Sequence, residues 1–209
     1  YTQKAASGTT KQLVLLAHGL GADGQDLIGL ASELEKALPD ATFISPDAPF
    51  PCDMAPYGRQ WFSLQSREEA DLEREVKTAA PILNAYIDAQ LKEYSLPISK
   101  LALVGFSQGT MTSLYTALRR EDAVAAIVGF SGAMVAAAKL PREIKSKPPV
   151  CLIHGEADPV VPFTAMEIAE RALKAAEVSV ETHARPNLQH GIDPQGLDIA
   201  ANFLQKHLL

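Results

Sequence analysis

Six short segments of the chain are rich in apolar residues and are separated by longer mixed stretches. Five of them are nearly continuous apolar runs, which are typical of strands covered on both faces, as in a parallel sheet. The sixth alternates apolar with polar residues, which predicts an edge strand with one wetter face. The predicted strands are Leu13–Ala17, Thr42–Ser45, Leu101–Phe106, Ala125–Phe130, Val150–His154 and Val178–Ala184.

Helical patterns fill the stretches between these strands, and in the first of them leucines recur at spacings of three and four. Ser66 with Glu69 resembles a capping box at the start of a long helix, and Pro81 is expected to kink or restart that helix. Strands that alternate with helices predict an α/β fold, a mostly parallel sheet with helices on both faces. The expected helices are Asp26–Leu38, Ser66–Tyr94, Gln108–Arg119, Phe163–Ala175 and Pro194–His207.

Composition narrows the class of protein. With 209 residues, 47% of them hydrophobic and 21% charged, we expect one globular domain over residues 1–209. The net charge of -6 and the lack of a basic run argue against a nucleic-acid partner. No apolar stretch approaches the roughly 20 residues that span a bilayer, so no transmembrane segment is expected. Cys52 and Cys151 have neither disulfide-framework nor zinc-site spacing, which favours a cytoplasmic location, although a start at Tyr1 instead of Met leaves the natural N-terminus open.

A strand-to-helix turn in mid-chain carries the strongest chemical signal. Residues 105–109, Gly-Phe-Ser-Gln-Gly, fit G-x-S-x-G between a predicted strand and a predicted helix. That context indicates the nucleophile elbow of an α/β-hydrolase fold, in which the serine hydroxyl is exposed near the positive end of a helix. A serine hydroxyl is a poor nucleophile by itself, so Ser107 needs a base within hydrogen-bond reach.

The chain has five histidines that could supply this base. His190 lies in the loop between the last strand and the last helix, from which it can overhang the edge of the sheet, and it is the predicted general base. The others have structural interpretations: His18 supports a glycine-rich loop, His154 ends a strand, His183 lies within one, and His207 lies near a helix C-terminus.

The third member of the triad must lie between the serine and the histidine, because this fold orders its triad as serine, acid, histidine. Asp158 follows the strand that ends at His154, and Glu156 is its rival in the same loop. Pro159 and Pro162 fix the backbone after Asp158, which favours this carboxylate as the residue that orients the base.

Acyl transfer also needs an oxyanion hole, usually of two backbone N–H groups, each worth about 3–4 kcal/mol. One is expected to be the N–H of Gln108, which follows the nucleophile. The other is expected from the early loop His18–Gly21, with Leu20 N–H as the candidate donor.

The order of these motifs resembles the phospholipase/carboxylesterase family, which includes the acyl-protein thioesterases. The resemblance covers nearly the whole chain, and residues 58–64 look like its bacterial branch. Two positions depart from the common pattern: Ser63 stands where many members have aspartate, and Gln189 where many have glycine. The motifs are His18–Gly21, Pro46–Pro49, Trp61-Phe62, Gly105–Gly109, His154-Gly155 with Asp158–Pro162, and His190-Gly191.

This resemblance implies a hydrolase of carboxylesters with apolar acyl chains, without metal or other cofactor, in which Ser107, Asp158 and His190 form the triad. It makes a homodimer plausible and adds lysophospholipids and acyl-thioesters as candidate substrates. The natural substrate stays open, as do rival hypotheses of a peptidase or lactonase and of a non-catalytic ligand-binding module on the same fold.

Apolar side chains in loops near the nucleophile are expected to line a short, open acyl groove that suits small ester substrates with short-to-medium acyl chains. Trp61, Leu64 and Val160 are the predicted wall residues. For Trp61 and its neighbour Phe62, a place in the core is the alternative.

Overall fold

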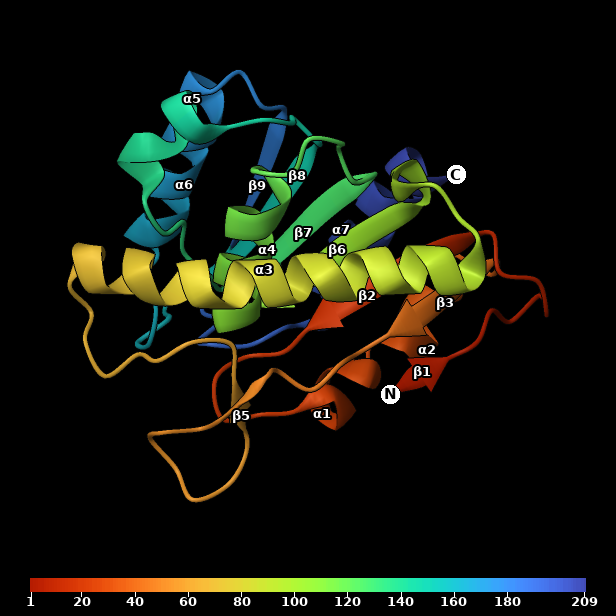
Figure 1. Cartoon of the computed structure of the whole chain (residues 1–209), viewed down its shortest axis with the longest axis horizontal. Coiled ribbons are helices and arrows are strands. Elements are labelled where there is room, and N and C mark those ends of the chain that lie inside the picture. Colours follow the sequence, from red (N-terminus) through yellow and green to blue (C-terminus); the bar gives the residue numbers. More distant parts are fainter.

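A seven-stranded sheet forms the centre of the computed structural model, which describes all 209 residues (Figure 1). Its order is β1-β3-β2-β6-β7-β8-β9, and every neighbouring pair is parallel except β1 with β3. All six predicted strands are present, and β9 lies at the edge as its alternating pattern predicts. The strands are β1 (Thr2–Gln3), β2 (Gln12–Ala17), β3 (Ala41–Ile44), β6 (Leu101–Phe106), β7 (Ala126–Phe130), β8 (Val150–Gly155) and β9 (Val180–Arg185).

Two hydrophobic cores, one on each face of the sheet, confirm the predicted layers. Leu13 and Leu15 of β2 point into one core, and Val14 and Leu16 point into the other. In Figure 1 the long helix α3 crosses the front of the sheet. The front core is covered by α3 (Glu69–Tyr94), α4 (Gln108–Ala117), α5 (Leu140–Glu143) and α6 (Thr164–Ala175), and the back core by α1 (Gly24–Ile28), α2 (Ala31–Leu34) and α7 (Pro194–Leu208).

Three local predictions about helices differ from the structure. The helix expected from Asp26 is two short helices: Asp23 caps α1 by accepting from the amides of Gln25 and Asp26, and Gly29 ends it. The long helix α3 runs through Pro81 without interruption, because its buried face packs along the sheet and outweighs the lost backbone hydrogen bond.

The predicted capping box of α3 is also absent. Ser66 accepts from the amide of Glu68 and donates to the carboxylate of Asp71, so its hydroxyl bonds a side chain two residues beyond Glu69. These two hydrogen bonds of Ser66 still hold the N-terminal end of α3 in place. At the other end of the chain, Pro194 occupies the first turn of α7 as expected, after the capping residue Asp193.

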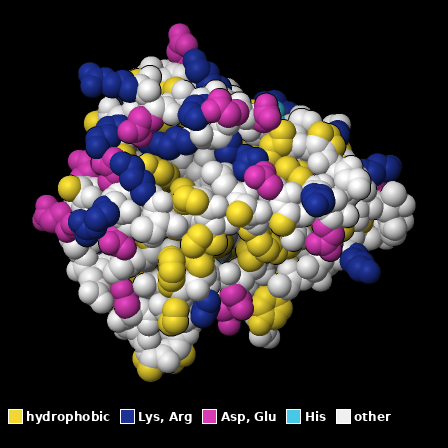
Figure 2. Space-filling view, viewed as in Figure 1, with side chains coloured by type: hydrophobic (Ala, Val, Ile, Leu, Met, Phe, Trp, Pro, Cys, Tyr) yellow, Lys and Arg dark blue, Asp and Glu magenta, His cyan; other side chains and the backbone are white.

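The segment between β3 and α3 extends below the sheet at the bottom of the view in Figure 1. It contains a small antiparallel pair, β4 (Phe50–Pro51) with β5 (Arg59–Gln60), separate from the main sheet. Figure 2 shows hydrophobic side chains gathered beneath α3, whereas charged side chains lie mainly along the upper and left edges of this face. None of the helices combines the length and the hydropathy that crossing a membrane would require.

Candidate active site

Ser107 lies at the junction of β6 and α4, in a backbone conformation that L-residues rarely adopt. Its φ of 52° and ψ of −114° mark a sharp, strained turn. The two flanking glycines make this turn possible. A Cβ on Gly105 would lie 2.5 Å from the amide nitrogen of Thr110, and one on Gly109 would lie 1.9 Å from the carbonyl oxygen of Ala17. The Ser107 residue keeps 8% of its surface exposed, and its hydroxyl makes no hydrogen bond within the chain.

Asp158 and His190 come from loops after neighbouring strands, β8 and β9, and are joined by a short hydrogen bond. His190 Nδ1 lies 2.7 Å from Asp158 Oδ2. If Nδ1 carries the proton it donates to the carboxylate, and Nε2 of the neutral ring is then an acceptor. The His190 ring also packs on Phe106, the residue before Ser107, with centroids 4.9 Å apart. These contacts bring a serine, a histidine and an aspartate to one edge of the sheet.

The carboxylate of Asp158 is fully buried yet well supplied with donors. Its second oxygen accepts from the amides of Val160 and Val161 at 2.8 and 2.9 Å. Burial by itself would raise the pKa of Asp158, but the hydrogen bonds from His190 and from the two amides outweigh it and hold the pKa below its ordinary value. Asp158 therefore stays ionised beside the histidine at neutral pH.

Three of the rival candidates have other partners. Glu156 is exposed, and its backbone amide bonds the carbonyl of Arg185. His18 is buried, with Nδ1 2.7 Å from the carbonyl of Gly19 and Nε2 accepting from the amide of Ala48, and burial lowers its pKa. His207 packs on Phe203 at the end of α7, away from Ser107. None of the three side chains is hydrogen-bonded or ion-paired to Ser107 or Asp158.

The loop after β2 lies directly against the nucleophile. A Cβ on Gly19 would lie 3.5 Å from the Cβ of Ser107. The N–H of Leu20 has no hydrogen-bond partner in the chain, and Gln108, as the first residue of α4, has an N–H without an intrahelical partner. Both predicted oxyanion donors are thus free amides at the elbow.

Backbone contacts hold this loop in place. The amide of Gly21 donates to the carbonyl of Arg59, and the amide of Arg59 donates back to the carbonyl of Ala22. The Arg59 guanidinium in turn binds the carbonyls of Ala48 and Pro49. The oxyanion loop is therefore fixed by a segment about forty residues further along the chain.

The side chain of Gln108 has a structural role that no sequence pattern indicates. Its Oε1 accepts from the amide of Trp61 at 2.9 Å, and its Nε2 donates to the carbonyl of Phe62 at 2.7 Å. Gln108 is fully buried, so it clamps residues 61 and 62 against the nucleophile turn. Only the G-x-S-x-G position could have singled it out.

A cavity of about 410 Å³ opens beside Ser107. That volume lies within the usual range of small-molecule sites. Nine of its fourteen lining residues are hydrophobic, and they include Leu64 and Val160, the latter 44% exposed at the rim. Arg67 and His190 are its only basic lining residues. The remaining lining residues are Gly19, Leu20, Leu72, Phe106, Ser107, Met111, Ala133, Val161, Pro162 and Ala165.

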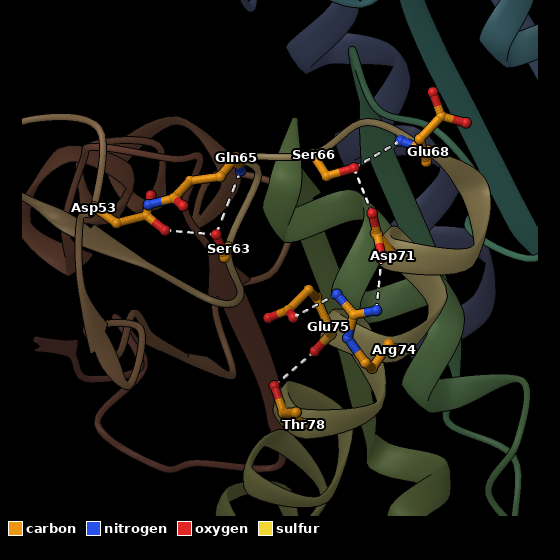
Figure 3. A network of polar contacts seen from close by, with 9 residues as sticks. All are labelled: Asp53, Ser63, Gln65, Ser66, Glu68, Asp71, Arg74, Glu75 and Thr78. Atoms are coloured by element: carbon orange, nitrogen blue, oxygen red, sulfur yellow. Dashed lines mark hydrogen bonds and ion pairs between the residues drawn. The ribbon is translucent and has the colours of Figure 1, made fainter.

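One wall of this cavity is a segment held by a polar network (Figure 3). The Ser63 hydroxyl donates to Asp53 and accepts from the amide of Gln65. Ser63 and Gln65 are the neighbours of Leu64 in the chain, so both ends of this residue are held. Ser66 ties the turn to Asp71, which pairs with Arg74. The network anchors the backbone that carries the wall residues of the 64–72 segment.

Trp61 does not belong to this wall, which differs from the expectation for the acyl groove. It is 2% exposed, and its indole N–H donates to the carbonyl of His18 at 2.9 Å. It adjoins instead a smaller hollow of about 150 Å³ between residues 46–49 and 82–86. The ring is directed inward because its N–H finds a partner at the end of β2.

Comparison with known proteins places the chain in a family. Residues 4–208 match the family model described as phospholipase/carboxylesterase. The chain belongs to this family. Its activity class is therefore that of the carboxylic ester hydrolases, and the resemblance found in the sequence motifs is confirmed.

Relatives of this phospholipase/carboxylesterase family member include several named hydrolases. Esterase YpfH of Escherichia coli is 28% identical over 93% of this chain and 82% of its own length. Acyl-protein thioesterase 1 homolog 1 of Dictyostelium discoideum is 28% identical over 100% of this chain and 95% of its own. Among solved structures, esterase PE8 is 40% identical with a TM-score of 0.95, covering 100% of this chain and 98% of that one.

Proposed function

We propose that this protein is a serine carboxylesterase that hydrolyses esters of short-to-medium acyl chains through an acyl-enzyme. The observation that carries the proposal is the 2.7 Å hydrogen bond from His190 to Asp158, in a cavity that His190 shares with the strained Ser107. Two free amides, of Leu20 and Gln108, adjoin the same serine. Family membership and esterase relatives support the same assignment.

The reaction proceeds in two half-reactions. Ser107 Oγ attacks the ester carbonyl carbon while its proton passes to His190 Nε2, and the oxyanion is held by the amides of Leu20 and Gln108. Collapse of this intermediate breaks the bond to the alcohol, which leaves with the proton from His190. Water then attacks the acyl-serine, giving its proton to His190, and the proton returns to Ser107 as the acid departs. Asp158 holds the imidazole orientation and stabilises the imidazolium.

The substrate class follows from the cavity. Its mainly hydrophobic lining suits an apolar acyl chain, and its volume of about 410 Å³ and exposed rim suit a chain of modest length. The Dictyostelium relative is named a thioesterase, so acyl-thioesters are the second substrate type to compare. Lysophospholipids are the third, since they also present an acyl ester.

The decisive experiment combines active-site labelling with turnover. A fluorophosphonate probe should modify Ser107, as read by peptide mass spectrometry. Ser107→Ala should lower kcat for p-nitrophenyl esters by roughly 10⁴-fold or more, and His190→Ala should have a comparable effect because triad members act as a unit. Ser113→Ala is the matched control: Ser113 is buried in the same helix α4 and its hydroxyl has no hydrogen-bond partner. Its kcat should equal that of wild type.

Two results would contradict the proposal. Full turnover in Ser107→Ala would exclude the serine mechanism. No label and no turnover on p-nitrophenyl esters, lysophospholipids and acyl-thioesters would favour a non-catalytic binding module on the same fold. A panel that turns over thioesters alone would retain the mechanism and reassign the substrate.

A further inference from the structure

A second histidine contacts the carboxylate that orients His190. His154, near the end of β8, is 2% exposed, and its Nε2 lies 3.3 Å from Asp158 Oδ2, the same oxygen that receives His190. The same Nε2 lies 2.9 Å from the carbonyl oxygen of Val161. A carbonyl can only accept, so Nε2 carries the proton and donates it to Val161, while Asp158 Oδ2 lies within ion-pair distance of the same nitrogen without a hydrogen bond to it.

These contacts close a small ring around Asp158. His154 N–H binds the carbonyl of Val161, and the amide of Val161 binds Asp158 Oδ1. With the amide of Val160 and with His190, the buried carboxylate accepts three N–H hydrogen bonds, and His154 Nε2 lies 3.3 Å from it as a fourth polar neighbour. An ionised carboxylate has about four acceptor sites, so three hydrogen bonds spread over its two oxygens leave the group little freedom to rotate.

The next residue, Gly155, ties the same strand end to the histidine loop. A Cβ on Gly155 would lie 2.3 Å from the carbonyl oxygen of Leu188 and 2.5 Å from that of Gln189. The amide of Ala157 also donates to the carbonyl of Leu188. The loop that presents His190 therefore packs directly against the strand that carries His154, and a shift of Asp158 would be transmitted to the catalytic imidazole.

We propose that His154 is a positioning residue for catalysis, whose Nε2–H holds the carbonyl of Val161 and so fixes the turn whose amides orient the Asp158 carboxylate for His190. This inference rests on the proposed serine mechanism. His154 does not line the substrate cavity, so its effect belongs to kcat and not to KM. Removing the hydrogen bond to the Val161 carbonyl loosens the turn that holds Asp158 and should lower kcat about tenfold.

The test is a double-mutant cycle with Asp158. His154→Phe removes the donor and keeps an aromatic ring beside Phe163, with which His154 forms an edge contact. This substitution should lower kcat about tenfold at unchanged KM when Asp158 is present. In the Asp158→Asn background the loss should be less than twofold, because the ionised carboxylate that the Val161 turn orients is then absent. His154→Gln retains an N–H donor of similar reach and should stay within about threefold of wild type.

The controls separate this inference from general damage to the fold. His183→Phe changes a half-buried histidine of the adjacent strand β9 that does not contact Asp158, and it should leave kcat unchanged. Circular dichroism and thermal melts check that each variant is folded at the assay temperature. If His154→Phe does not fold, a folded His154→Gln with a tenfold loss of kcat overturns the inference.

Two further outcomes would overturn it: wild-type kcat in His154→Phe, or equal losses with aspartate and asparagine at position 158. Ser107→Ala is assayed in parallel. An active Ser107→Ala would remove the serine mechanism itself, whereas an inactive Ser107→Ala with additive His154 and Asp158 effects would remove only the role of His154.

Discussion

Leu64 gives the sharpest test of the acyl cavity, because it lies half-buried in the wall on the segment between β5 and α3. Each methylene that leaves water for an apolar wall gains about 0.8 kcal/mol, which is about fourfold in kcat/KM per carbon. From four to eight acyl carbons the gain should reach about 200-fold. Leu64→Ala removes wall carbons on one side, so we expect about twofold per carbon, or about 16-fold over the same series.

The assay is kcat/KM for p-nitrophenyl esters with acyl chains from two to sixteen carbons. Wild type should rise and then level off once the cavity of about 410 Å³ is full. The matched control is Ile168→Ala, an exposed aliphatic residue of α6 outside the cavity, which should follow the wild-type curve. A flat wild-type series, or a Leu64→Ala curve parallel to it, would refute the cavity as the acyl site and leave Leu64 as a packing residue.

Three other predictions follow from groups around the site and the core. Since the base must be neutral and the pKa of Asp158 lies below its ordinary value, kcat/KM should rise with pH through one ionisation above pH 4; a second step there would contradict this assignment. Lys139 and Lys77 lower the pKa of Glu73 to about 2, so its stabilising effect is complete above the unfolded value of 4.5 and is lost as the pH falls towards 2. Urea unfolding should therefore show a flatter acid dependence in Glu73→Gln, and identical slopes would argue against the pairing. Trp61→Phe leaves the carbonyl of His18 unpaired and should lower the free energy of unfolding by about 1–3 kcal/mol without changing the acyl-chain series; a changed series would return Trp61 to the wall.

The sequence predicted features whose cause is local. Apolar runs identified five of the six main strands, and alternation identified the sixth, β9, at the edge. Burial on both faces or on one face determines which positions of a strand are apolar, so this pattern can be read from the sequence. The positions of Asp158 and His190 after neighbouring strands predicted a common edge of the sheet, where the structure joins them by a hydrogen bond.

Features that depend on distant partners could not be predicted in this way. The Gln108 side chain binds the backbone of residues 61 and 62. No residue pattern in either segment indicates that the two segments are in contact. Trp61 could not be placed from the sequence either, because its inward direction depends on a carbonyl just after β2. The role of His154 could not be predicted because it depends on the position of Asp158 in the folded chain. The uninterrupted helix at Pro81 shows packing against the sheet overriding a local preference.

The positive φ of Ser107 sets catalysis against stability. A non-glycine residue in such a conformation carries about 1–3 kcal/mol of strain. Favourable contacts of the surrounding structure must offset this strain in every folded molecule. Ser107→Gly relieves this strain of about 1–3 kcal/mol, whereas the greater freedom of glycine in the unfolded chain destabilises the fold by only about 0.5–1 kcal/mol. The inactive variant should therefore unfold at a higher urea concentration than wild type. Selection for thermal resistance alone would therefore be expected to discard the nucleophile, and a lower urea midpoint for the glycine variant would show that the elbow is not strained.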